Sequence, residues 1–139
     1  MNIKRIYGIY DVIKKELPST YIFPKLAFFQ DEKCMLDNTG LEHTEDESVY
    51  AVVDPDTQTI NLPLEMTFIY TNSKGEDYDK KVSINKIDDY EIAHTLLHEC
   101  AHIYFGEKYG YNSKQYSDEA ACNSFAIRWL KKFKQKKLL

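Results

Sequence analysis

Apolar residues near the start of the chain recur at helical spacing. They fall three or four positions apart, with lysines between them, and the run ends before Pro18, because proline cannot continue a helix. This pattern predicts an amphipathic helix over residues 3–17. The apolar positions are Ile3, Ile6, Tyr7, Tyr10, Ile13 and Leu17.

The middle of the chain has the pattern of strands. Aromatic and β-favouring residues fill 21–29, and Pro24, which cannot donate a ladder hydrogen bond, predicts an edge strand there. The polar, acidic residues 37–48 indicate a loop. Two β-rich runs within 49–63 flank the turn sequence Asp54-Pro55-Asp56 and predict a hairpin. Runs over 66–71 and 80–85 predict a second hairpin around residues 72–75.

Helical spacing returns at Asp88, which forms a capping box with Glu91. One apolar stripe predicts a helix over 89–105, and we expect Gly106 and Gly110 to stop it. Residues 106–116 then form a loop, and Ser117 is a good cap for a last helix. That last helix is expected to carry Ala120, Ala121, Phe125, Ala126, Trp129 and Leu130.

Composition places the chain among globular proteins. Its 139 residues suit one domain over 1–139, and 43% hydrophobic with 29% charged residues excludes disordered and fibrous classes. The mixture of helices and strands predicts an α+β fold. Three cysteines without a CxxC pair indicate free thiols in a reducing compartment. The chain has no apolar run of about 20 residues and no secretory signal core, so we expect a cytoplasmic protein without membrane association.

Charge is distributed unevenly along the chain. The formal net charge is −4, yet the last twelve residues carry six lysines and arginines and no acid. A basic tail can bind nucleic acid or an acidic partner. Cations at the end of a helix also complement its dipole, and this is the interpretation we favour. The acidic remainder of the chain argues against direct nucleic-acid binding.

The predicted helix over 89–105 contains the sequence His98-Glu-Cys-Ala-His102, which is an HExxH motif. Residues four apart lie on one face of a helix, so both imidazoles can reach one ion about 2 Å from their nitrogens. Glu99 lies one residue further round the helix. There it is suited to act as a general base toward water activated by zinc.

A catalytic zinc needs a third protein ligand and one open position. Asp118 and Glu119 begin the next helix, and the gap of 16 or 17 residues after His102 lets that helix turn back beside the first. We favour Glu119, which shares a face with Asn123 and small residues, over Asp118. Glu107 is expected to point away from the ion.

Other residues near the motif are weaker candidates. His94 lies one turn before His98, and three histidines along one helix span about 12 Å, too far to meet at one ion. Cys100 and Cys122 are expected to be apolar fillers. One of four tyrosines could donate a hydrogen bond to an oxyanion, and the sequence leaves open which. These are Tyr104, Tyr109, Tyr111 and Tyr116.

The segments HTLLHECAH and SDEAACNSFAIRWL resemble the ImmA/IrrE family of zinc metallopeptidases, whose signature is HExxH followed by a helix reading approximately ExxANxFA. Glu119, Asn123, Phe125 and Ala126 match that helix. Ala121 and Cys122 depart from it, where the family usually has an acidic residue and an alanine. The resemblance covers about residues 92–130, and the segment 64–87 is longer than is usual in the family.

The resemblance implies a small zincin-like α+β domain. Its expected parts are an N-terminal helix, a small twisted, mostly antiparallel sheet, the HExxH helix and a C-terminal helix bearing the glutamate ligand. It also implies a bacterial or phage zinc metallopeptidase that cleaves a helix-turn-helix transcriptional repressor supplied in trans. An alternative is a zinc-containing interaction module that binds a regulator without cleaving it. The HExxH glutamate favours the hydrolase, because structural zinc sites are usually closed sets of four ligands.

Overall fold

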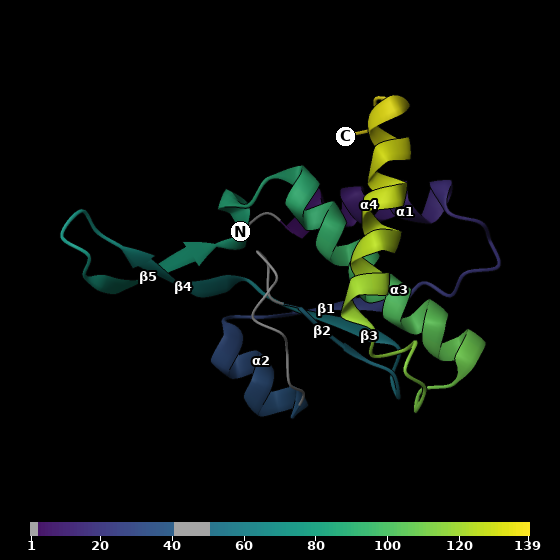
Figure 1. The fold of residues 1–139 in the computed structure, drawn as a ribbon, viewed down its shortest axis with the longest axis horizontal. Coiled ribbons are helices and arrows are strands. Elements are labelled where there is room, and N and C mark those ends of the chain that lie inside the picture. The colour runs from purple at the N-terminus through teal and green to yellow at the C-terminus, as the bar shows by residue number, and fades with distance from the viewer. Residues whose placement is uncertain (1–2, 41–50) are drawn as a thin grey trace.

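The computed structural model describes residues 3–40 and 51–139. Helices pack beside a small three-stranded sheet, and a two-stranded arm projects away from both (Figure 1). Along the chain the elements are α1 (Ile3–Glu16), β1 (Lys25–Phe29), α2 (Glu32–Thr39), β2 (Val52–Asp54), β3 (Thr59–Pro63), β4 (Glu65–Thr71), β5 (Asp77–Ser83), the 3-10 turn η1 (Ile84–Lys86), α3 (Asp89–Tyr109) and α4 (Glu119–Gln135). This arrangement confirms the α+β prediction.

The three-stranded sheet has the order β1-β3-β2, and β3 is buried along its whole length. Strands β2 and β3 form the predicted antiparallel hairpin, and β1 lies at the edge, as Pro24 indicated. The expectation of a mostly antiparallel sheet is wrong at β1, which pairs parallel with β3. The long connection between them contains α2 and β2, and such a crossover is what a parallel pair requires.

The second predicted hairpin is confirmed as a separate two-stranded sheet. Strand β4 pairs antiparallel with β5, from Glu65 opposite Ser83 to Thr71 opposite Asp77. At its base, the backbone N–H of Thr67 donates to the Glu32 carboxylate at 2.7 Å. This bond attaches β4 to α2, and the remainder of the arm extends away from the helices (Figure 1).

Helix α2 was not predicted. Its N-cap is Asp31, whose carboxylate accepts from the Cys34 N–H, and Gly40 ends it with a left-handed φ of 66°. Only Met35 is buried within it, so the sequence has no amphipathic stripe there. The predicted loop over 37–48 is therefore wrong at residues 37–39, and its residues 41–48 lie outside the described chain.

Helix α3 begins at its predicted cap, because the Asp88 side chain accepts from the Glu91 N–H at 2.8 Å. The expected stop at Gly106 is wrong, since the helix continues to Tyr109 and Gly110 caps it with φ +97°. A Cβ at Gly106 would lie 2.4 Å from a ring carbon of Tyr111. Glycine therefore serves close packing at this position and does not end the helix.

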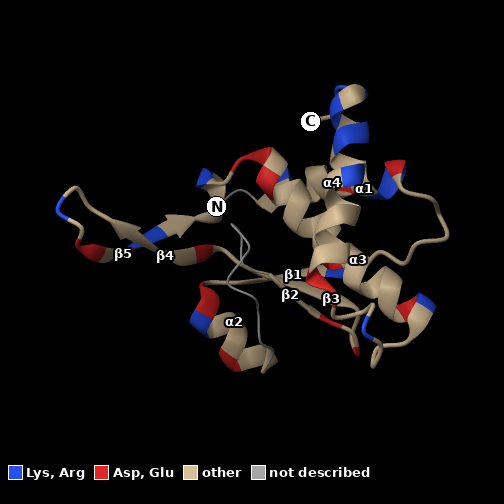
Figure 2. Cartoon of the chain, in the orientation of Figure 1, with Lys and Arg blue, Asp and Glu red and all other residues tan. Residues whose placement is uncertain are grey.

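Helix α3 is the centre of the hydrophobic core. One side of it packs against α1, and α4 crosses it (Figure 1). Arg5 of α1 pairs with Asp89 at 2.6 Å and donates to two carbonyls of the preceding turn, which fixes the start of α3. Lysines gather at the C-terminal end of α4 (Figure 2), where Lys136 pairs with Glu16 of α1 at 2.8 Å.

In the described part of the chain, none of the helices combines the length and the apolar character that a membrane crossing needs.

Candidate metal centre

Helix α3 presents His98 and His102 on one face, one turn apart. Their ring centroids lie 4.9 Å apart, and only 1% and 7% of the two residues is exposed. The burial follows from the crossing of α4 over this face of α3. Both imidazoles are thus held between two helices, and solvent does not surround them.

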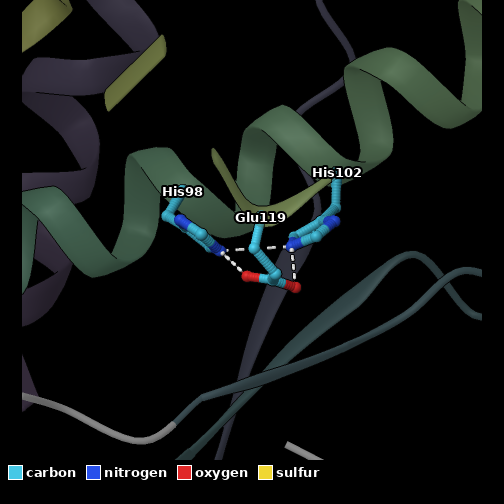
Figure 3. A group of neighbouring side chains, drawn as sticks. All are labelled: His98, His102 and Glu119. Carbon is cyan, nitrogen blue, oxygen red and sulfur yellow. Dashed lines mark hydrogen bonds and ion pairs between the residues drawn. The ribbon is translucent and has the colours of Figure 1, made fainter. Parts of the chain in front are cut away.

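Glu119, the first residue of α4, directs its carboxylate between the two rings (Figure 3). Its Oε2 lies 2.7 Å from His98 Nε2, and its Oε1 lies 3.2 Å from His102 Nε2. The two Nε2 atoms are 3.2 Å apart. Among the described residues, His98, His102 and Glu119 form a group that could hold a metal ion.

The spacing of these donor atoms agrees with tetrahedral coordination. Ligand atoms about 2.0–2.1 Å from a tetrahedral ion are separated from one another by about 3.3 Å. The two Nε2 atoms, 3.2 Å apart, have this separation. The Glu119 carboxylate approaches the two rings through different oxygens, Oε2 at 2.7 Å and Oε1 at 3.2 Å, so it lies next to both histidine ligand atoms.

The outer nitrogens of the two rings have partners that set their protonation. His102 Nδ1 lies 2.5 Å from the backbone carbonyl of Tyr116, which only accepts, so Nδ1 carries the proton. His98 Nδ1 lies 2.7 Å from Asn123 Oδ1, which accepts in the same way. In the neutral rings both Nε2 atoms then present lone pairs toward the Glu119 carboxylate. Three electron-rich groups that converge in this way form a site for a cation.

The competing carboxylates have other partners. Asp118, the alternative third ligand, is the N-cap of α4 and accepts from the Ala121 N–H at 3.0 Å. It replaces Ser117, which was the predicted cap. Glu107 accepts hydrogen bonds from Gln58 and Tyr111, both outside the metal group. The structure thus brings Glu119 to the histidines, as favoured from the sequence.

His94 lies outside the three-residue group, as its helical spacing predicts. Its ring stacks at 6.3 Å from that of His98, one turn toward the start of α3.

Glu99 lies on α3 between the two histidines and is only 4% exposed. Its charge acts on Tyr116, whose pKa is raised to about 12 by burial first and then by Glu99 and other neighbours, Asp54 among them. The Tyr116 ring also packs 5.6 Å from the His102 ring. Tyr116, one of the four tyrosines considered, is thus tied to both a histidine and Glu99.

The cysteines near the motif are buried, as expected for apolar fillers. Cys100 is 3% exposed and Cys122 is fully buried, and both belong to the hydrophobic core. Burial raises the pKa of the Cys100 thiol to about 12. A thiol that stays protonated at neutral pH is a poor nucleophile.

Two partners of the histidines were not recognised from the sequence. Asn123 was noted for its helix face and its match to the family motif, and Tyr116 was one tyrosine among four. The position of Asn123 one turn after Glu119 was a usable signal, since both side chains then reach the same histidine. The Tyr116 contact is made by a backbone carbonyl, which no sequence pattern marks.

No family model, curated protein or solved structure matches the chain. The resemblance to the ImmA/IrrE family therefore rests on the residues themselves.

Proposed function

We propose that this protein is a zinc-dependent metallopeptidase. The observation that supports this most is the convergence of His98 Nε2, His102 Nε2 and the Glu119 carboxylate, with both Nδ1 atoms held by acceptors. Two imidazoles and one carboxylate are a ligand set of catalytic zinc, which leaves a position open for water or substrate. We propose zinc for this reason; the lack of cysteine in the three-residue group distinguishes it from the cysteine-rich sites of structural zinc.

Each residue of the site has a proposed role. When bound here, zinc would act as a Lewis acid that polarises the scissile carbonyl and makes water more acidic. Glu99, buried beside the ligands, takes a proton from the attacking water and delivers it to the departing amine. The Tyr116 hydroxyl, kept protonated by its raised pKa, is available to donate to the oxyanion.

We propose that the substrate chain lies along β2. This strand is at the edge of the three-stranded sheet, and no strand of the described chain pairs with its outer side, where an extended peptide would pair. Asp54, its last residue, is close enough to Tyr116 for its charge to help raise the tyrosine pKa. A peptide paired with β2 would therefore run past Tyr116 and the ligands. The target must then expose an unfolded or loop segment.

For the target we retain a helix-turn-helix transcriptional repressor of a phage or mobile element, acting in the bacterial cytoplasm. This choice rests on the family resemblance of residues 92–130.

The first test is zinc content, measured by elemental analysis after purification without chelator. We expect about one zinc per chain in the wild type and a clear loss in Glu119→Ala, because two histidines alone hold the ion weakly. Asp118→Ala and Glu107→Ala remove nearby carboxylates outside the group and should retain zinc. A wild type that takes up no zinc even when zinc is supplied would refute the proposal.

The second test separates hydrolysis from binding. Glu99→Gln should keep its zinc and lose about 10²–10⁴-fold in cleavage of a candidate repressor, followed by mass spectrometry of the fragments. Cleavage by Glu99→Gln at the wild-type rate would contradict the role of Glu99. A stable repressor complex without fragments, unchanged by Glu99→Gln, would instead support the alternative of a non-catalytic zinc module.

A further inference from the structure

The β4–β5 arm has two chemically different faces. Side chains alternate along each strand, so cross-strand partners share a face. One face, here called the aromatic face, consists of Met66, Phe68, Tyr70, Tyr78, Lys80 and Val82. The opposite face contains the acidic residues of both strands, which are Glu65, Asp77 and Asp79.

The outer part of the aromatic face is exposed. Tyr70 is 40% exposed and Tyr78 is 47% exposed. Their rings stack at 5.9 Å, Phe68 packs edge-on against Tyr70, and the Lys80 ammonium lies 5.5 Å above the Tyr70 ring. Exposed aromatic rings held by one another lose little conformational entropy on binding, which favours them as anchors at interfaces. Phe68 packs against the hydrophobic core, whereas Tyr70 and Tyr78 lie outside it, so the core does not require the two tyrosine rings.

A hollow of about 770 Å³ lies against this face and continues to the turn before α3. Its apolar lining comes from Phe68, Val82 and Ile87 besides Tyr70. Three lysines, Lys80, Lys81 and Lys86, line it, and no carboxylate is among the described residues that do. Lys81 belongs to the opposite face, where its ammonium lies 3.9 Å from Glu65, so the positive charge at the aromatic face comes from Lys80 and Lys86. The hollow therefore combines apolar and positively charged side chains.

The carboxylates of the arm are directed elsewhere. Asp77 accepts from the Thr71 hydroxyl at 2.8 Å, and Glu65 lies 3.9 Å from the Lys81 ammonium. A second hollow, at the base of the arm, is lined by three carboxylates, Asp31, Glu32 and Glu65, together with Lys33, Thr67 and Lys81. These carboxylates thus lie outside the hollow at the aromatic face.

We infer that the aromatic face of the arm is a docking site for a short acidic segment of a protein partner, with carboxylates flanking an aromatic or aliphatic anchor. The anchor would fill the hollow against Phe68 and Tyr70, and its flanking carboxylates would meet Lys80 and Lys86. Lysines next to apolar side chains are complementary to that sequence type.

Two other occupants fit less well. A nucleic acid would continue beyond the hollow onto acidic surface, because Asp88, Asp89 and Glu91 follow directly at the start of α3 (Figure 2). Its phosphates would be repelled there. A second copy of the chain, paired symmetrically through the same face, would bring Lys80 near its own equivalent, and like charges disfavour such an interface.

The arm is separate from the metal centre in the fold, so the inference does not depend on the peptidase proposal. It is tested by fluorescence anisotropy with a labelled heptapeptide whose central phenylalanine and leucine are flanked by glutamates. We expect saturable binding that weakens as salt is raised. The same peptide with lysines in place of the glutamates should bind at least about fivefold more weakly, since it loses the charge complementarity.

Matched variants locate the binding site. Lys80→Glu and Tyr70→Ser should each weaken binding by about fivefold or more, as is typical for contacts at the centre of an interface. Lys74→Glu makes the same charge change in the turn, and Ile69→Ser removes an exposed apolar residue from the opposite face. Both controls should bind like the wild type, as should Glu99→Gln. Circular dichroism confirms that each variant is folded.

Several results would overturn the inference. Absence of peptide binding, or equal losses in Lys80→Glu and Lys74→Glu, would remove the aromatic face as the site. Displacement of the peptide by oligothymidine that binds more tightly would assign the face to nucleic acid. Sedimentation that shows a dimer, lost in Tyr70→Ser, would assign it to a second copy of the chain.

Discussion

Asn123 offers a direct test of how the candidate metal centre is held. Its Oδ1 lies 2.7 Å from His98 Nδ1, and this contact orients the ring so that Nε2 faces Glu119. Asn123→Ala removes this acceptor. The Nδ1–H of His98, a residue that is only 1% exposed, then loses this hydrogen-bond partner. Loss of a hydrogen-bond partner behind a metal ligand typically lowers metal affinity about 10–100-fold, or ~1.4–2.7 kcal/mol.

The assay is competition for zinc with a chromophoric chelator at neutral pH, with the fold of each variant checked by circular dichroism. Asn123→Asp keeps an acceptor at the same place and should restore most of the affinity. Ser124→Ala, at the exposed neighbouring position of α4, is the control and should bind zinc like the wild type. Equal affinities in the wild type, Asn123→Ala and Ser124→Ala would show that Asn123 does not orient His98, and the reasoning would be refuted.

Two further predictions concern packing around the centre. Gly106→Ala places a Cβ 2.4 Å from a Tyr111 ring carbon and should displace the loop that carries Tyr116. We therefore expect a lower urea midpoint of unfolding and a lower zinc affinity. A Gly106→Ala/Tyr111→Ala double variant that recovers neither quantity would contradict this cause. In the folded protein at pH 8, a thiol reagent such as DTNB should label Cys34 readily. The buried Cys100 and Cys122 should react only after unfolding. Fast labelling of all three thiols would refute the burial of Cys100 and Cys122.

Local patterns in the sequence were sufficient for most elements. Three of these patterns act over only a few residues. Pro18 ends α1, the Asp-Pro-Asp turn forms the β2–β3 hairpin, and the Asp88 cap starts α3. The pair His98 and His102 is local in the same sense, because i,i+4 spacing on a helix places both rings on one face. Helix α2 was missed since it buries only Met35 and depends on its caps, Asp31 and Gly40.

The remaining features depend on contacts between residues far apart in the chain. The parallel pairing of β1 with β3 depends on how the connection crosses the sheet, which side-chain alternation does not encode. Gly106 was taken for a helix stop because its close contact with Tyr111 exists only in the folded chain.

At the candidate metal centre, the sequence supplied the types of the possible ligands and the spacing of the two histidines. It left Asp118 and Glu119 as alternatives. A shift of one residue in the start of α4 decides which carboxylate caps the helix and which faces α3. The tertiary structure decided this through the crossing of α4 over α3, where Asp118 binds the Ala121 N–H and Glu119 meets the two Nε2 atoms. The partners of the outer nitrogens, a side chain on α4 and a carbonyl in a loop, depend on the same crossing.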